Sequence, residues 1–199
     1  IKKRIKKLIK KPKIIEEETL AEIRKKIPFS LTSSQDKVCA EILNDITSEK
    51  KMLRVLQGDV GSGKTVVSMI SAFAVVKAGY QVAFLCPTEL LAKQHCQLFK
   101  RTLGDTNCKI ELLSSKIKNS EQSNIRTLLS ENKIDIIIGT HSLFQEKTLF
   151  KNLGLIIIDE QHKFGVQQRI DLSLKGNVNT DVLLMTATPI PRTLILTTY

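Results

Sequence analysis

The stretch LQGDVGSGKTVV, residues 56–67, contains the spacing Gly-x-x-x-x-Gly-Lys-Thr, which predicts a loop that holds phosphate groups. Its glycines carry no Cβ, so backbone N–H groups can turn toward phosphate oxygens. A helix beginning at Lys64 would point its N-terminal dipole at the same anion. The Lys64 ammonium group could neutralise the β- and γ-phosphates, and the Thr65 hydroxyl could bind Mg²⁺. An apolar strand before the loop and a helix after it favour this function over a purely structural loop.

Outward from this loop, short apolar runs alternate with amphipathic stretches. Runs without polar alternation are typical of strands buried on both faces, and we expect strands at residues 52–56, 81–85, 109–113, 134–138, 153–159 and 181–186. The other stretches predict helices at residues 14–27, 64–78, 88–102, 120–131, 142–147 and 166–174, with Thr88 and Ser142 as caps and Gly79 at a helix end. The pattern indicates an α/β domain with a doubly wound, mainly parallel sheet flanked by helices. Ligands of such sheets bind at the carboxyl ends of the strands.

Two further motifs follow strands that are expected to end at this edge. Asp159 and Glu160 close an apolar run; Asp159 suits Mg²⁺, and Glu160 suits the alignment and deprotonation of an attacking water. An acidic strand end in solvent is the alternative, which the upstream phosphate loop makes less attractive. In TATPIPRT, Thr186 and Thr188 can hydrogen-bond a neighbouring acidic loop. The strand 181–186 is therefore predicted to lie between the strands that carry the phosphate loop and the two carboxylates.

The segment FSLTSSQ, residues 29–35, places an aromatic ring and a glutamine upstream of the phosphate loop. An amide can pair with the N6 and N7 atoms of adenine, so Gln35 could select ATP over GTP. The same residue is equally placed to begin a surface helix. His95 and Cys96 adjoin in QHCQ, and we expect them on a helix face rather than in a metal or thiol site, because no further ligand is spaced nearby.

Composition bounds the remaining alternatives. The 199 residues are 42% hydrophobic, which suits one globular domain, and the short apolar runs predict no membrane span. Four cysteines without C-x-x-C spacing predict reduced thiols in a cytosolic protein. The net charge is +11, and residues 1–13 carry eight Lys or Arg and no acid. This run could attract nucleic-acid phosphates, but the helical spacing of Ile1, Ile5, Leu8 and Ile9 favours a solvated helix with an apolar stripe.

The segments GDVGSGKT, PTELLAKQH, GTHSLFQ, DEQH and TATPIPRT, in this order, resemble the first motor lobe of superfamily 2 helicases. Within that group, residues 28–199 are similar to the RecG-type ATP-dependent DNA helicases. The resemblance implies a RecA-like P-loop lobe at residues 28–199, and residues 1–27 would be a basic helical arm or linker from a preceding domain. The transcription-repair coupling translocases share the phosphate loop and TATPIPRT, but they usually have DEEH where this chain has DEQH.

The resemblance implies a monomeric motor of the bacterial cytoplasm that uses ATP and Mg²⁺ to remodel replication forks and Holliday junctions in recombination and repair. Such motors have a second lobe with an arginine finger, which we do not find in these residues. Arg192 is a poor substitute because it belongs to the Mg²⁺-binding lobe. Since the first residue is Ile, we expect an excerpt of a longer protein or the product of a broken gene, with ATP binding but little hydrolysis. A nucleotide-dependent nucleic-acid-binding module without motor activity and a decayed gene product are the alternatives.

The resemblance also assigns roles to individual positions. The nucleotide-binding residues are Phe29 and Gln35 at adenine and Gly58, Asp59, Val60, Gly61, Ser62, Gly63, Lys64 and Thr65 at the phosphates. The catalytic residues are Lys64, Asp159 and Glu160, with Thr65 and Asp159 at Mg²⁺. The residues that would couple nucleotide state to DNA are Gln161, His162, Thr186 and Thr188. The expected contacts to the DNA backbone are Pro87, Thr88, Gly139, Thr140, His141 and Ser142.

Overall fold

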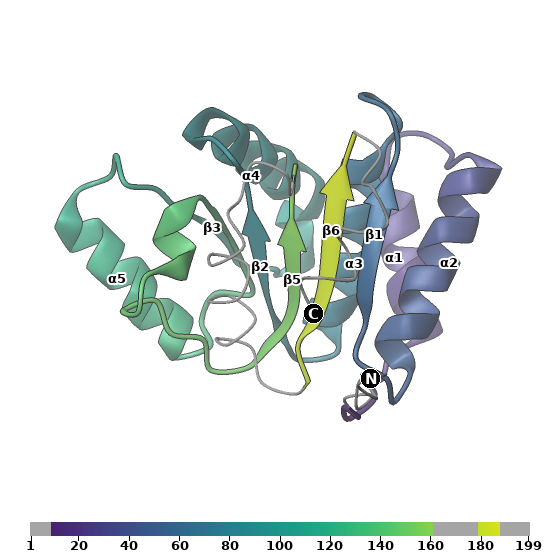
Figure 1. Cartoon of the computed structure of the whole chain (residues 1–199), viewed down its shortest axis with the longest axis horizontal. Helices are drawn as coiled ribbons and strands as arrows, with labels where there is room; N and C mark the ends of the chain where they lie inside the picture. The colour runs from purple at the N-terminus through teal and green to yellow at the C-terminus, as the bar shows by residue number, and fades with distance from the viewer. Residues whose placement is uncertain (1–8, 161–178, 188–199) are drawn as a thin grey trace, which may run out of the picture.

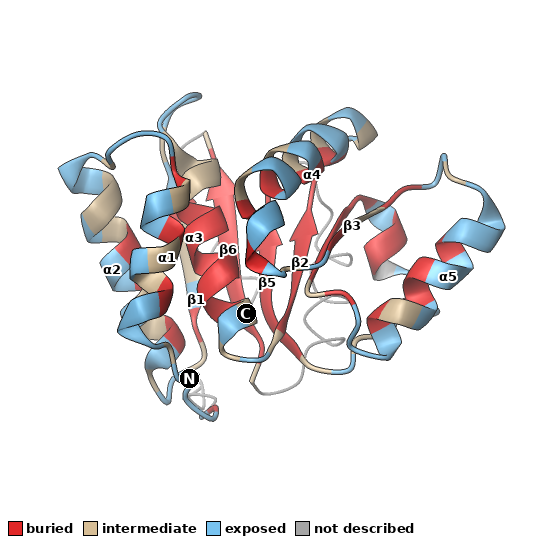
Figure 2. Cartoon of the chain, turned by 180° about the vertical axis from the view of Figure 1, so that it is seen from behind, coloured by how far each residue is buried: buried red, intermediate tan, exposed pale blue. Residues whose placement is uncertain are grey.

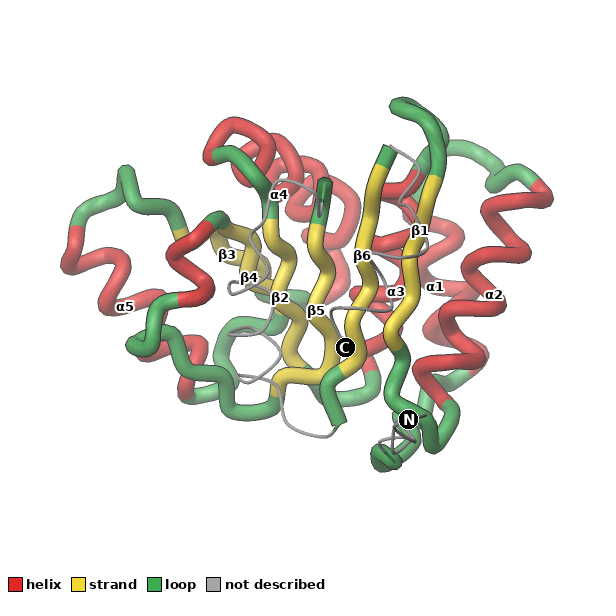
Figure 3. Tube along the Cα trace, in the orientation of Figure 1, coloured by secondary structure: helices red, strands yellow, loops and turns green. Residues whose placement is uncertain are grey.

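The strands form one parallel sheet. In the computed structural model, which describes residues 9–160 and 179–187, the strand order is β1-β6-β5-β2-β4-β3 (Figures 1 and 3). The strands are β1 Leu53–Gln57, β2 Gln81–Leu85, β3 Ile110–Leu113, β4 Ile136–Gly139, β5 Leu153–Ile158 and β6 Asp181–Thr186. Because every pair is parallel, all six strands end at the same edge of the sheet.

Helices cover both faces of this sheet. The α-helices are α1 Glu17–Lys26, α2 Ser33–Thr47, α3 Lys64–Lys77, α4 Glu89–Leu103 and α5 Asn119–Ser130, and two short 3₁₀ helices are η1 Gly104–Thr106 and η2 His141–Phe144. Helices α1 to α4 share one hydrophobic core with the sheet, whereas α5 and η2 contribute to a second core on the opposite face. The sheet is therefore the middle of three layers.

Alternate residues of each central strand enter these two cores. In β5, Leu155 and Ile157 belong to the first core, and Ile156 and Ile158 belong to the second. Figure 2 shows the inner strands β2, β4, β5 and β6 buried and the outward surfaces of the helices exposed, whereas the edge strands β1 and β3 are partly exposed. Burial on both faces explains why the inner strands lack the polar alternation of a half-exposed sheet, as the sequence predicted. The prediction was wrong for the edge strand β1, of which only Leu56 is buried, and incomplete for β3.

The sheet order confirms the prediction for the last strand. Strand β6 lies between β1 and β5, with Leu53 opposite Val182 and Leu155 opposite Asp181. The bounds of β2 and β6 are those expected, and those of the other strands differ by at most two residues. Thr88 caps α4, since its hydroxyl accepts a hydrogen bond from the N–H of Leu91, and Gly79 ends α3 with φ +84°.

Two helix predictions were wrong or incomplete. Residues 142–147 do not form a helix: the chain makes only the short η2, and Ser142 does not cap it because its hydroxyl donates to the Leu113 carbonyl. The sequence suggested helix α2 only indirectly, because Gln35 could begin a surface helix. It is a full helix that begins with a capping box between Thr32 and Gln35. The helix expected at residues 166–174 lies outside the described residues.

The basic N-terminal segment also differs from expectation. Its described part, residues 9–13, is not helical, and Ile9 makes an isolated antiparallel bridge to Lys50. Lys10 and Lys13 are not solvated, because both side chains are fully buried against the carboxylate of Asp181. A buried carboxylate requires a compensating positive charge. Meeting this requirement outweighs the cost of removing the two ammonium groups from water.

Residues 9–27 lie against the lobe. Helix α1 packs on α3 and α4, and Ile23 and Ile27 belong to the first core. The assignment of residues 1–27 to an arm or linker remains a prediction. In the described part of the chain, no helix is long and apolar enough to cross a membrane, and all four cysteines are free thiols.

Candidate functional site

The phosphate loop connects β1 to α3 at the carboxyl edge of the sheet. Gly61 and Gly63 adopt φ +83° and +87°, which side chains with a Cβ rarely tolerate, and Gly63 directly precedes the first turn of α3. The N–H of Gly58 donates to the carbonyl of Thr186, 3.2 Å away. This contact joins the phosphate loop to the end of β6, and thus to the start of the TATP segment.

Lys64 is folded over the loop that precedes it. Its ammonium group donates to the carbonyl oxygens of Gly58 and Asp59, at 2.5 and 2.7 Å. Both acceptors are neutral carbonyl oxygens of the phosphate loop, and they hold the Lys64 ammonium group against that loop. Phosphate oxygens carry full negative charge and are stronger acceptors, so the ammonium group is placed to exchange one set of partners for the other.

Gln35 lies at the start of helix α2, which is the alternative that the sequence offered beside adenine binding. Its side-chain oxygen accepts from the N–H of Thr32 and completes the cap of α2, while its amide nitrogen donates to the carbonyl of Ser62 at 2.9 Å. A Cβ at Gly63 would lie 2.3 Å from that nitrogen. The glutamine therefore begins a helix and also touches the phosphate loop.

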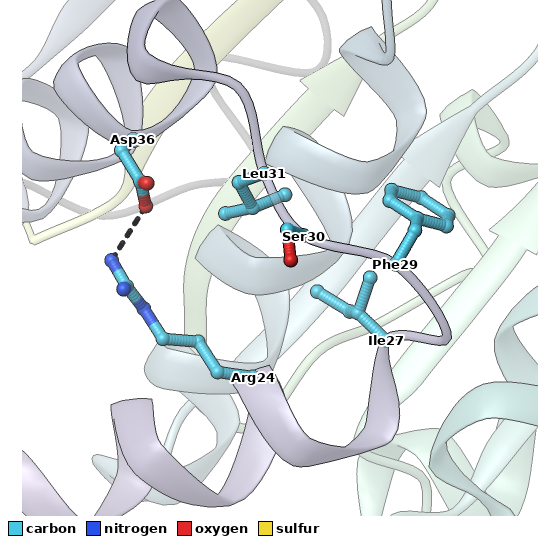
Figure 4. Close-up of a pocket in the computed structure, with 6 residues that line it drawn as sticks. All are labelled: Arg24, Ile27, Phe29, Ser30, Leu31 and Asp36. Carbon is cyan, nitrogen blue, oxygen red and sulfur yellow. Dashed lines mark hydrogen bonds and ion pairs between the residues drawn. The ribbon is translucent and has the colours of Figure 1, made fainter.

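Phe29, in the segment before α2, is 53% exposed. It lines two hollows, of about 400 and 310 Å³. Figure 4 shows its ring pointing away from the ion pair between Arg24 and Asp36, which are 2.7 Å apart at the far side of the larger hollow. A flat, half-exposed ring beside open volume can stack on a nucleobase.

The two carboxylates follow β5, two strands away from β1. Asp159 is 9% exposed, and its N–H donates to the carbonyl of Leu85 at 2.9 Å. Glu160 has φ +48°, a left-handed conformation that non-glycine residues adopt rarely and that recurs at functional sites. The strand end thus turns abruptly at this pair.

His95 reaches this acidic motif, which the sequence did not foresee. Its Nε2 atom is 3.2 Å from Oδ2 of Asp159, and its ring lies against Phe84 with centroids 4.9 Å apart. Cys96 behaves as expected: it is buried in the first core, and burial raises the pKa of its thiol. Burial likewise raises the pKa of Cys86, and the nearby Asp159 raises it further, so this thiol stays protonated at neutral pH.

The donor set at this edge fits Mg²⁺. The described residues contain no group of three His, Cys, Asp or Glu side chains arranged as a metal site. Mg²⁺ in nucleotide sites is held by one or two carboxylates together with substrate phosphates and waters. The Thr65 hydroxyl and the Asp159 carboxylate are oxygen donors of this kind, on elements that meet at one edge.

A separate cavity with polar lining, of about 530 Å³, lies beyond the ends of β2 and β4. Five of the six residues expected to contact the DNA backbone line it, namely Pro87, Thr88, Thr140, His141 and Ser142. Gly139 lies beneath, where a Cβ would come within 2.5 Å of the Leu113 carbonyl. The lining residues that the sequence did not single out are Glu89, Ser115, Asn119, Gln122, Gln145 and Lys147.

Internal hydrogen bonds fix the shape of this cavity. The hydroxyl of Thr140 donates to the Glu89 carboxylate at 3.1 Å, and that of Ser142 donates to Leu113. Glu89 also accepts from the N–H and hydroxyl of Ser115. Burial alone would raise the pKa of Glu89, but the hydrogen bonds from Ser114, Ser115 and Thr140 outweigh it and lower the pKa. Glu89, the first residue of α4, thereby connects the two loops that follow β3 and β4.

Thr186, the described member of the coupling set, is buried at the end of β6, where its carbonyl contacts the phosphate loop. Gln161, His162, Thr188 and Arg192 lie outside the described residues. Their expected roles remain predictions.

A sequence model of the DEAD/DEAH box helicases matches residues 32–196, a range that contains the phosphate loop, the acidic motif and the TATP segment. The chain belongs to the DEAD/DEAH box helicase family. The ATP-dependent DNA helicase RecG of Aquifex aeolicus is 46% identical over 192 residues, which are 96% of this chain and 24% of that protein. RecG of Thermotoga maritima is 48% identical over 188 residues, 94% of this chain and 24% of that protein. The chain thus spans about a quarter of the length of these helicases.

Solved helicase structures agree with this assignment. A structure of RecG bound to a three-way DNA junction matches with a TM-score of 0.82 and 43% identity, over 97% of this chain and 26% of that one. The helicase MrfA, at 16% identity and a TM-score of 0.67, shares the fold over 94% of this chain and 32% of that one. The similarity to RecG inferred from the motifs is confirmed, and so is the RecA-like helicase lobe.

Proposed function

We propose that this helicase lobe is the ATP-binding half of a RecG-type motor that moves along DNA and remodels branched junctions. The observation that carries the proposal is the meeting of three motifs at one edge of the sheet. The phosphate loop follows β1, the acidic pair follows β5, and β6 lies between them with its last carbonyl bonded to Gly58. A nucleotide at the loop would therefore lie beside the carboxylates and the TATP segment together.

Each side chain has a distinct part in this proposal. Lys64 would transfer its hydrogen bonds from the loop carbonyls to the β- and γ-phosphates. Thr65 and Asp159 would hold Mg²⁺, which would supply positive charge to neutralise the phosphates. Glu160 would orient a water and accept its proton. Phe29 and Gln35 would hold the adenine, for which Gln35 would have to exchange its hydrogen bond to Ser62.

The cavity beyond β2 and β4 is the proposed contact with the DNA backbone. Among the described residues, its lining offers amide, hydroxyl and lysine donors, including Asn119 and Lys147, and no Phe, Tyr or Trp side chain. Such donors suit phosphate oxygens, which position a protein on DNA without selecting sequence. The binding would therefore weaken as salt concentration rises.

Turnover is proposed to need a second lobe. An arginine finger contributes on the order of 10³–10⁵ in rate to phosphoryl transfer, and it must approach the γ-phosphate from the side opposite the Mg²⁺-binding lobe. We expect the 199-residue chain to bind Mg-ATP weakly, to hydrolyse it near background and to unwind no DNA. A second lobe supplied in trans, or on a longer chain, should restore hydrolysis that forked DNA stimulates.

The test measures ATP affinity by calorimetry and hydrolysis with and without forked DNA. Lys64→Ala should weaken ATP binding about 10- to 100-fold, the value of a hydrogen bond to a charged group, without unfolding the chain. Glu160→Gln should retain ATP binding, and in the two-lobed protein it should lose about 10²–10⁴ in turnover. Unchanged ATP binding in Lys64→Ala would refute the site, and robust DNA-stimulated hydrolysis by the 199 residues alone would refute the need for a second lobe.

A further inference from the structure

The contact between His95 and Asp159 joins a residue of α4 to the acidic motif across 64 positions of sequence. Both side chains are only 12% exposed, so the contact is shielded from bulk water. An ionised carboxylate can only accept hydrogen bonds. Nε2 of His95 must therefore carry the hydrogen, and Nδ1 is left as the acceptor nitrogen when the ring is neutral.

The imidazole ring is held independently of Asp159. Phe84, on β2, lies 4.9 Å from it between centroids, and Phe99 packs edge-on against Phe84 at 5.4 Å. Cys96, the next residue of α4, is buried in the first core. These contacts fix the ring before any ligand arrives, so His95 presents a preset donor to the carboxylate.

The contact is at the long end of the hydrogen-bond range, at 3.2 Å. A bond of this kind can restrict the rotation of a carboxylate without neutralising it. Groups that hydrogen-bond a metal-binding carboxylate orient it, and their loss typically lowers metal affinity or activity 10- to 100-fold.

We propose that His95 is a positioning residue that fixes the Asp159 carboxylate in the orientation needed by Mg-ATP. This inference rests on the proposed function, because it assumes that Asp159 faces the metal. It gives the histidine of PTELLAKQH a role in the nucleotide site in addition to its place in α4.

The test uses the 199-residue chain and a fluorescent, non-hydrolysable ATP analogue, titrated in Mg²⁺ and again in EDTA. His95→Ala should weaken binding in Mg²⁺ about 10-fold and leave binding in EDTA unchanged. His95→Gln, which keeps an N–H donor, should recover part of the loss. Gln97→Ala, an exposed position on the same helix, is the matched control and should bind as the unmodified chain does.

A double-mutant cycle decides whether His95 acts through Asp159. Asp159→Asn should remove most of the Mg²⁺ dependence, and adding His95→Ala to it should change nothing more. Equal losses in Mg²⁺ and EDTA, no loss in Mg²⁺, or full additivity in the cycle would each overturn the inference. If the unmodified chain itself shows no Mg²⁺-dependent binding, the proposed function fails and the inference fails with it. Mg²⁺-dependent binding with an unaffected His95→Ala refutes the inference alone.

Discussion

Two buried aspartates on neighbouring strands stand at opposite ends of the sheet. Asp159 follows β5 at the carboxyl edge, and Asp181 begins β6 at the amino edge. Asp181 is fully buried and accepts from the ammonium groups of Lys10 and Lys13, at 2.5 and 2.7 Å, and from the N–H of Met52 at 2.7 Å. Among the described residues, the side chain of Asp159 has one hydrogen-bond partner, His95.

The comparison distinguishes a carboxylate whose charge and hydrogen bonds are satisfied within the protein from one that can still bind a ligand. Around Asp181 even the lysines have further partners. Lys10 donates to the carbonyls of Asp45 and Ile46 at the end of α2, and Lys13 donates to the carbonyl of Asn179. A carboxylate whose charge is fully compensated by lysines attracts no further cation. Asp159, with its single described hydrogen-bond partner, can still bind one.

The largest expected effect is the loss of charge at the amino edge. Asp181→Asn leaves two buried ammonium groups without a counter-charge, so the free energy of unfolding should fall by about 3–5 kcal/mol. Denaturation in urea measures it, with Asp159→Asn as the matched change at the other edge. We expect that control to lose under about 1 kcal/mol, because the only side-chain hydrogen bond described for Asp159 is long, at 3.2 Å. Equal losses at the two positions would remove the distinction between them.

An intermediate effect is expected in the phosphate loop. Gly63→Ala places a Cβ at φ +87° and against Gln35, while Gly61→Ala meets similar strain at φ +83° with no atom within 4 Å. Left-handed strain alone costs about 1–2 kcal/mol. Gly63→Ala should cost about 1 kcal/mol more, since it also breaks the bond from Gln35 to Ser62. Urea denaturation of the two variants measures the difference, and identical stabilities would show that Gln35 contributes nothing to the loop.

The smallest effect concerns Glu89, which is well bonded like Asp181 but lies at the carboxyl edge like Asp159. Glu89→Gln should lower the free energy of unfolding at pH 7 by about 1 kcal/mol, through weaker acceptance from Ser115 and Thr140. Hydrogen bonds lower the pKa of Glu89 below its ordinary value of 4.5. Its stabilisation is therefore complete above pH 4.5 and is lost as pH falls through the folded-state pKa.

Denaturation at pH 7 and pH 3 measures this dependence, and the gap between the unmodified chain and Glu89→Gln should narrow in acid. A gap that widens in acid would mean that Glu89 is stabilised in its protonated form. A gap at pH 7 as large as that of Asp181→Asn would show that the number of partners, rather than full burial of the charge, sets the cost.

Sequence reasoning recovered what depends on local pattern. The strand bounds, the start of α3 at Lys64 and the place of β6 followed from apolar runs and from motifs that must meet at one edge. Helix α2 had a readable signal as well, because Thr32 and Gln35 have capping-box spacing. The basic run at residues 1–13 led to the wrong prediction of a solvated helix, since the burial of Lys10 and Lys13 depends on an aspartate about 170 positions away.

The contact between His95 and Asp159 was out of reach for the same reason. It arises where α4 crosses the end of β5, and no spacing within QHCQ or DEQH encodes it. Pairing between distant side chains is decided by the crossing of elements, which a single sequence does not specify.

The strand order also has a consequence for synthesis on the ribosome. Within the described sheet, β1 neighbours β6 alone, and 129 residues separate Met52 from Asp181. Nascent chains that end before Thr186 cannot pair β1 or bond Gly58 to the end of β6, however well α3 and the central strands have packed. The phosphate loop is thus completed only once β6 has emerged, and nucleotide binding should appear in the growing chain after that strand and not before it.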